Sequence, residues 1–228
     1  MDGRRPVGIM YTNTSVDHPT KEIEYNRWYH DVHFPDVTEP GIFVNALMFH
    51  NAVTPLPPGQ GKFLAFYESF WPDLDFAYGE FSKTVKMLRE QKRIHAGTAQ
   101  PGLYGIYRQL SIHFSTQRRR RSQSVMAVMI DCKEKGKEND LKKWYNEKHV
   151  KEVVDLGIYH TGSFSQLITG EPFKQHITER HPNFMAIYES DIGDPQALAK
   201  EVGSRFPKNY VPSYVDIMGV SLWYRVSP

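Results

Sequence analysis

The chain has 228 residues, of which 40% are hydrophobic and 13% aromatic, which is enough apolar material for one large domain or two small ones. Its 28 basic and 26 acidic residues leave a formal charge of +2, so no overall field favours nucleic acid or an anionic membrane. A single cysteine, Cys132, excludes an internal disulfide framework and a cysteine-rich zinc site.

Taken in chain order, runs of β-branched and aromatic residues predict strands, and helical spacing of apolar residues predicts the helices between them. In the first half, the order strand, helix, strand, strand, helix, strand is predicted for about Val7–Asn13, Lys21–Val37, Phe43–Asn51, Lys62–Ser69, Leu74–Lys92 and Leu103–Ile112. The second half repeats this order at about Val125–Cys132, Asn139–Asp155, Tyr159–Ile168, Phe184–Ser190, Pro195–Arg205 and Val215–Tyr224. Each half therefore has the βαββαβ order of a ferredoxin-like unit.

Three ordered sequence matches indicate that the second half is a repeat of the first. They pair Trp28-Tyr29-x-x-x-His33 with Trp144-Tyr145-x-x-x-His149, Gly41-Ile42-Phe43 with Gly157-Ile158-Tyr159, and Phe63–Ser69 with Phe184–Ser190. We therefore expect a first repeat at 1–114 and a second at 124–228, joined by an arginine-rich linker at 115–123. We interpret the four-arginine run Arg118–Arg121 as solvated linker, although such a run could also be a nuclear address or a phosphate-binding patch.

Both faces of the predicted strands are largely apolar, so a sheet with helices on one face still needs cover on the other. The second repeat can supply that cover. We therefore predict an α+β fold in which two tandem ferredoxin-like βαββαβ repeats pack face to face as an intramolecular pseudo-dimer with a barrel-like core, the arrangement that the resemblance below names a dimeric α+β barrel. Such packing would hide the sheet face that RNA-binding proteins of similar topology use, and the RNA-binding sequence motif of those sheets is absent here, so we expect no nucleic-acid partner.

The first half resembles the dimeric α+β barrel superfamily, and its EthD-like proteins in particular. The resemblance is carried by Trp28-Tyr29-x-x-x-His33-Phe34-Pro35 and by Pro40-Gly41-Ile42-Phe43. The second half keeps Trp144, Tyr145 and His149 but has Lys151 and Leu156 where the prolines would stand. The resemblance implies a small ligand-binding barrel. Enzymes of this superfamily include cofactor-independent cyclases, decarboxylases, dehydratases and monooxygenases, while other members bind haem.

The candidate catalytic residues are those that could move a proton or hold a developing charge. They are His33, Tyr29, His149 and Glu68. An imidazole exchanges protons near neutral pH, and a carboxylate inside an apolar strand is costly to bury without a partner. Each of them also has a structural interpretation: the histidines can cap or pack on a helix, and the glutamate can reach solvent or an arginine at a strand end.

The candidate substrate-binding residues are Trp28, Asn45, His50, Tyr67 and Tyr11, which supply broad rings and polar groups near those side chains. We expect no metal site, because the closely spaced histidines lack a matching carboxylate, and no phosphate-binding glycine loop is present.

These observations lead to the hypothesis of a cytoplasmic enzyme that acts without a cofactor on a small hydrophobic, aromatic or polyketide-like substrate. The reaction would be an elimination, decarboxylation, cyclisation or isomerisation by His-mediated proton transfer, as in a lyase or isomerase. The alternatives are a haem-binding or non-catalytic small-ligand-binding barrel and a cofactor-free monooxygenase. The chain is expected to be a monomer, as a pseudo-dimer, or a homodimer, and it contains no apolar run long enough to cross a membrane.

Overall fold

The computed structural model describes residues 3–57, 59–95, 98–99, 103–115, 121–170, 181–206 and 211–225. These residues form two compact units, which we call the N-terminal unit, built around Pro6–Arg108, and the C-terminal unit, built around Gln109–Leu167 and Pro182–Arg225. Each is described by itself. Within the described residues, no helix is long and apolar enough to cross a membrane.

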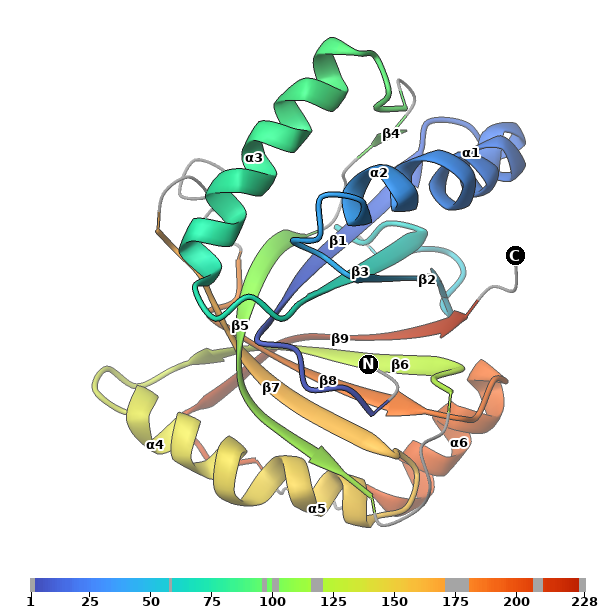
Figure 1. Ribbon diagram of the computed structural model, residues 1–228. Coiled ribbons are helices and arrows are strands. Elements are labelled where there is room, and N and C mark those ends of the chain that lie inside the picture. The colour runs from blue at the N-terminus through green and yellow to red at the C-terminus, as the bar shows by residue number, and fades with distance from the viewer. Residues whose placement is uncertain are drawn as a thin grey trace. The chain divides into compact units, whose positions relative to one another are not determined.

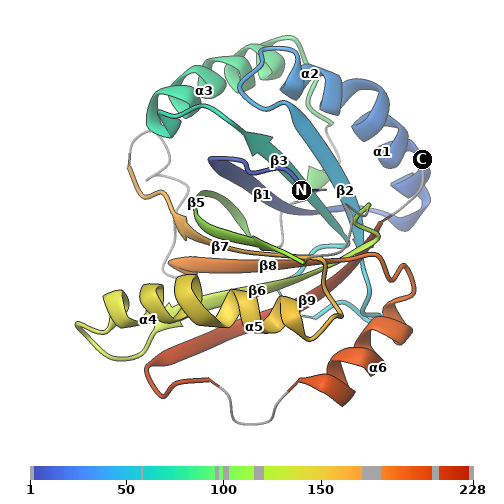
Figure 2. The same ribbon diagram turned by 60° about the horizontal axis from the view of Figure 1, so that its bottom comes forward.

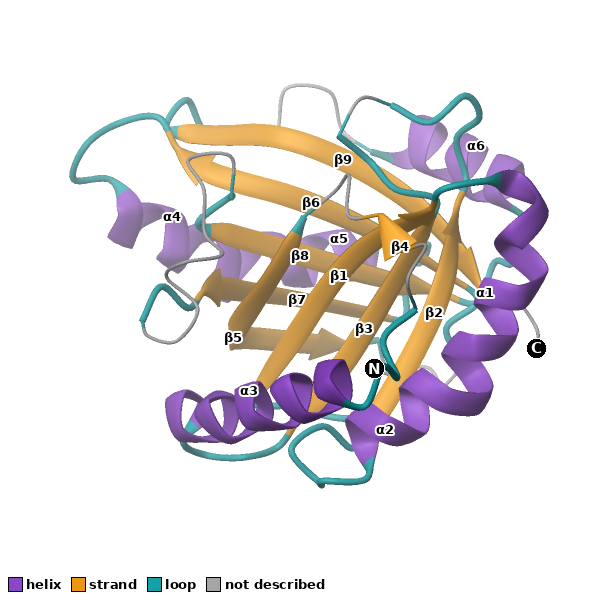
Figure 3. Ribbon diagram, turned by 90° about the horizontal axis from the view of Figure 1, so that it is seen from above, coloured by secondary structure: helices purple, strands orange, loops and turns teal. Residues whose placement is uncertain are grey.

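The N-terminal unit has an antiparallel sheet in the order β2-β3-β1-β5, in which β1 lies between β3 and β5. Its strands are β1 (Gly8–Val16), β2 (Asn45–Asn51), β3 (Phe63–Ser69), the short β4 (Thr98–Ala99) beside β1, and β5 (Tyr104–Phe114), whose second part enters the C-terminal unit. The helices are α1 (Glu22–Trp28), α2 (Phe34–Thr38) and α3 (Leu74–Glu90). All three lie on one side of β1, β2 and β3 (Figures 1 and 3).

The C-terminal unit repeats this plan with an antiparallel sheet in the order β9-β6-β8-β7. Its strands are β6 (Ser124–Cys132), β7 (Thr161–Leu167), β8 (Phe184–Ser190) and β9 (Val215–Arg225), and its helices are α4 (Glu138–Trp144), α5 (Val150–Asp155) and α6 (Pro195–Arg205). Helices α4 and α5 follow each other as one rod, as Figure 2 shows. The element order predicted from the sequence is thus confirmed in both halves.

Strand alternation gives the N-terminal sheet two different faces. The face toward the helices carries Phe63, Ala65 and Tyr67 of β3, which pack with Leu74 and Tyr78 of α3 in one buried core. The intervening β3 residues, among them Glu68, therefore point to the opposite face. This division decides which predicted site residues can meet.

The matched Gly-Ile-aromatic segments end the first helix of each unit. Gly41 and Gly157 both have φ of +76°, a left-handed conformation that a side chain would strain. Their amides bond to the carbonyls of Thr38 and Val154, each at 3.0 Å, so the two helices end in the same way. The next residues, Ile42 and Ile158, are buried.

The boundaries of the predicted repeats, 1–114 and 124–228, remain a prediction. Most of the arginine run of the predicted linker, at 116–120, lies outside the described residues. Ser122, which we expected to be exposed in that linker, is instead fully buried, and its hydroxyl donates a hydrogen bond to Glu189. Short polar side chains such as serine can be buried when they find such an acceptor.

Candidate functional site

A π-helical turn interrupts the first long helix of each unit, at Tyr29–His33 and at Tyr145–His149. In each, the backbone amide after the turn, of Phe34 or of Val150, bonds to the carbonyl of the tyrosine five residues earlier. The sequence predicted one uninterrupted helix at Lys21–Val37. The structure corrects this, because one helical turn in each unit is wider. Such turns are rare and often lie at functional sites.

The wider turn brings Trp28 and His33 together. In an α-helix of 3.6 residues per turn, side chains five positions apart point about 140° away from each other. Here the two rings stack, with centroids 4.6 Å apart and planes 22° apart, and Tyr29 meets His33 edge-on at 4.8 Å. We call Trp28, Tyr29 and His33 the N-terminal clasp.

The C-terminal clasp consists of Trp144, Tyr145 and His149 and has the same geometry. Trp144 stacks on His149 at 4.1 Å, and Tyr145 meets the imidazole edge-on at 4.9 Å. The two copies differ in access, because His149 is only 5% exposed whereas His33 is partly exposed. The repeated motif found in the sequence therefore corresponds to a repeated local structure.

Burial keeps both clasp histidines uncharged. Burial lowers the pKa of His33 to about 4, although the negative charge of the nearby Asp36 carboxylate acts in the opposite direction. Burial lowers the pKa of His149 to about 4 as well. At neutral pH both imidazoles are therefore neutral. A group with a pKa this far below the working pH is a weak general base.

Tyr67 is the other predicted residue that meets the N-terminal clasp. Its ring lies edge-on to His33, with centroids 6.1 Å apart, and it also contacts Phe34. His50 lies on the helix-facing side of the same sheet and meets Phe63 edge-on at 4.8 Å. Burial lowers the pKa of His50 to about 4, with the charge of Lys62 acting in the same direction.

Glu68, Asn45 and Tyr11 lie on the opposite face of the sheet. The Asn45 side-chain amide donates a 3.0 Å hydrogen bond to Glu68, which is directly across the strand pair. Tyr11 packs edge-on against Phe66, with centroids 5.5 Å apart. The structure therefore separates the candidate residues into two groups. The sequence could not show this, because a shift of one residue in strand phase exchanges the faces.

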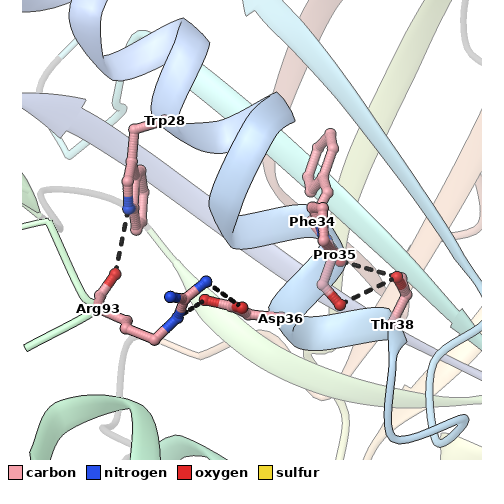
Figure 4. A network of polar contacts seen from close by, with 6 residues as sticks. All are labelled: Trp28, Phe34, Pro35, Asp36, Thr38 and Arg93. Carbon is pink, nitrogen blue, oxygen red and sulfur yellow. Dashed lines mark hydrogen bonds and ion pairs between the residues drawn. The ribbon is translucent and has the colours of Figure 1, made fainter. Parts of the chain in front are cut away.

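Sequence reasoning missed an ion pair that holds the segment after α3 against the clasp. The guanidinium of Arg93 donates two hydrogen bonds to Asp36, at 2.8 and 2.7 Å, and the Arg93 carbonyl accepts one from Trp28 Nε1 at 3.1 Å (Figure 4). His95 then meets the Trp28 ring at 5.4 Å. Because Arg93 and Asp36 are 57 positions apart, no local pattern could predict the pair.

Pairing with Arg93 offsets the negative charge of Asp36 that acts on the His33 ring, and this gives a first testable prediction. Replacing Arg93 with glutamine leaves Asp36 without its counter-charge, so the pKa of His33 should rise by on the order of half a unit. Asp36→Asn should shift it in the opposite direction. The measurement is an NMR titration of the His33 ring protons, and His149 in the same spectra is the control. Equal shifts at His33 and His149 would contradict the assignment.

No cluster of three or more histidine, cysteine, aspartate or glutamate side chains in the described ranges is arranged to hold a metal ion. Comparison with protein-family models finds no match. Comparison with curated proteins likewise finds no match.

Solved structures, in contrast, resemble the chain over nearly its whole length. A single-residue variant of DypB from Rhodococcus jostii RHA1, in complex with heme, has a TM-score of 0.56 at 11% identity, with 98% of this chain and 94% of that chain covered. The encapsulated DyP-type peroxidase of Mycobacterium smegmatis has a TM-score of 0.56 at 8% identity, covering 98% and 93%. A candidate chlorite dismutase has a TM-score of 0.50 at 11% identity, covering 98% and 96%.

These likenesses show the fold, and the predicted α+β fold class is confirmed. They also correct the predicted function. The hypothesis of a cofactor-independent lyase or isomerase is wrong, because the neighbours are mostly dye-decolourising peroxidases and related proteins, one of them a heme complex. The low pKa of the clasp histidines agrees with the correction, since proton transfer was the proposed role of His33.

Proposed function

We propose that this chain is a haem-binding protein and that His33 is the iron ligand. The observation that carries the proposal is a neutral, partly exposed imidazole held by a π-helical turn, in a fold that a heme complex shares. An imidazole binds a metal through the lone pair of a deprotonated ring nitrogen, so the low pKa of His33 favours the binding form at neutral pH.

The residues around His33 fit the role of an iron ligand. Trp28 and Tyr29 contact the face and the edge of the imidazole, and these contacts fix its orientation. Coordination uses a lone pair in the plane of the ring, so stacking on the ring face leaves it available. Asp36 adds a negative field close to the ring, which its pairing with Arg93 reduces.

His149 fits the role less well, although its clasp has the same geometry. Only 5% of its surface is exposed, so a large planar ligand would have to displace packed side chains to reach it. Tyr145 beside it stacks on Phe164 with centroids 4.4 Å apart, and Tyr145 and Phe164 belong to the core of the C-terminal unit. We therefore propose that the iron-binding histidine is His33 of the N-terminal unit alone.

When bound, haem would supply one-electron and oxygen or peroxide chemistry, while His33 would hold the iron and the protein would set the surroundings of the group. We also propose that the chain is similar to EthD-like proteins. Trp28, Tyr29, His33 and the Pro40–Phe43 segment carry that resemblance. We further propose that the chain binds a small hydrophobic ligand and that it is a monomer or a homodimer, as expected from the sequence.

A haem titration of the purified protein tests this proposal. Added haem should give a saturable shift of the Soret absorbance band in the wild type and in His149→Gln, whereas His33→Gln should weaken binding by about tenfold or more. Circular dichroism of all three proteins checks that the variants fold. An unsaturable wild-type titration, or equal affinity in His33→Gln, would refute the assignment.

A further inference from the structure

Three exposed aromatic side chains lie close together where β3 ends and α3 begins. They are Phe70, Trp71 and Phe76, which are 39%, 39% and 54% exposed. The rings of Trp71 and Phe76 meet with their centroids 6.0 Å apart and their planes inclined by 36°. We call these three residues the aromatic patch. Large apolar side chains that are exposed next to one another commonly mark a surface that binds another molecule.

The indole of Trp71 is held in place although it is exposed. Its Nε1 donates a 3.0 Å hydrogen bond to the carbonyl of Gly41, in the turn that ends the first helix of this unit. The backbone amide of Trp71 donates a 3.4 Å hydrogen bond to the hydroxyl of Ser69 at the end of β3. A ring that is already ordered loses little conformational entropy when a partner covers it, and this favours binding.

The C-terminal unit shows that the fold does not need aromatic residues at these positions. Asp73 and Asp194 cap α3 and α6 in the same way, each accepting a hydrogen bond from a backbone amide of the first turn. The two segments can therefore be matched residue by residue. The C-terminal unit has Asp191, Ile192 and Ala197 where the aromatic patch stands. The patch is thus specific to the N-terminal unit, and packing within the fold does not account for it.

The charges around the aromatic patch are mainly negative. The segments that form the patch and its support, 38–45 and 69–77, contain no lysine or arginine but three exposed carboxylates, those of Glu39, Asp73 and Asp75. Arg108 of β5 lies 3.6 Å from Asp75, too far for a short charge-assisted hydrogen bond, and the Asp75 side chain stays 59% exposed. A partner that covers the patch therefore meets aromatic rings bordered by carboxylates.

These charges disfavour two simple occupants of the aromatic patch. A second copy related by a two-fold axis would bring the carboxylates of both protomers together, and like charges repel across an interface. An anionic lipid surface attracts lysine and arginine, which these two segments lack. Arginine and lysine on a partner protein, in contrast, pair with carboxylates and are attracted to the faces of tryptophan and phenylalanine rings.

We propose that the aromatic patch is a docking surface for a protein segment in which arginine or lysine alternates with apolar residues. The apolar side chains cover the rings, and the basic side chains pair with Glu39 and Asp75. This surface goes beyond the proposed haem function, and none of its residues belongs to the N-terminal clasp. It is therefore tested on haem-free protein, and failure of the haem titration does not affect it.

Isothermal titration calorimetry with three synthetic octapeptides tests this surface. The first peptide alternates leucine and arginine, the second leucine and glutamate, and the third glycine and arginine. The first should bind the wild-type protein with a Kd of about 50 μM, and the other two should bind about tenfold more weakly, because each lacks one of the two required features. Raising the salt concentration should weaken binding of the first peptide, since part of the attraction is between exposed charges.

Three variants show whether the first peptide binds at the aromatic patch. Trp71→Ala should weaken its binding by about tenfold or more, and Asp75→Asn by about threefold. Val220→Ala is the matched control, because Val220 is an exposed apolar residue on β9 of the C-terminal unit and should leave the affinity unchanged. All three changes are at exposed positions, so the variants should fold, as circular dichroism can check.

Three results of the titrations would overturn the proposal: no binding of the first peptide, equal affinity for either of the other two, or equal affinity in Trp71→Ala and the wild type. Sedimentation of the protein alone, and with vesicles that contain phosphatidylserine, covers the other occupants. A dimer or a vesicle complex that Trp71→Ala abolishes would assign the aromatic patch to a second copy or to a membrane and would also refute the proposal.

Discussion

Lowering the pH from about 7.5 to about 5 should weaken the fold by about 2 kcal/mol for each of the two clasp histidines. Burial lowers the pKa of His33 and of His149 from 6.5 to about 4 in the folded protein. Between these values the unfolded chain binds more protons than the folded one. The stabilisation is therefore complete above about pH 6.5 and is lost as the pH falls toward 4. His50 acts in the same direction.

Urea unfolding at the two pH values measures this effect. His33→Gln and His149→Gln should each reduce the difference between the two free energies of unfolding by about 2 kcal/mol. His18→Gln, at an exposed histidine before the short turn Pro19–Lys21, shows what the same substitution does outside the clasps. If the clasp variants retained the full wild-type dependence on pH, the two imidazoles would not be the buried neutral groups described above.

Replacing Gly61 with alanine should destabilise the N-terminal unit by about 3 kcal/mol or more. A Cβ at this position would lie 2.3 Å from the Thr14 carbonyl oxygen and 2.6 Å from its carbon, both of which are backbone atoms. The Gly61 amide also donates a 2.7 Å hydrogen bond to Asn13. Relief of this clash would require β1, which carries Thr14, to move away from Gly61.

Gly79→Ala is the control with the opposite expected sign. Gly79 lies within α3, and an added Cβ would meet nothing within 4 Å, so alanine should stabilise the helix by about 1 kcal/mol. The denaturant midpoints of the two variants, compared with that of the wild type, measure both changes in stability. A Gly61→Ala protein as stable as the wild type would show that β1 and the segment before β3 are not packed as closely as described.

For the clasps, the sequence alone predicted where the residues lie but not the backbone conformation that holds them. The repeat of Trp, Tyr and His at equal spacing indicated that both halves hold these residues at the same place on a helix, and the structure confirms it. The π-helical turn was not predicted, because helical periodicity does not reveal one extra residue in a turn. That turn nevertheless determines that His33 stacks on Trp28.

The sequence by itself determined the α+β class, the order of the elements and their duplication, because hydrophobic periodicity and turn residues act over a few neighbouring positions. Only the tertiary structure decided which candidate residues meet: it placed Glu68 and Asn45 on one face and Tyr67 on the other, and it joined Arg93 to Asp36. It also decided the protonation of His33, because burial and neighbouring charges set a pKa, and both arise from residues distant in the chain.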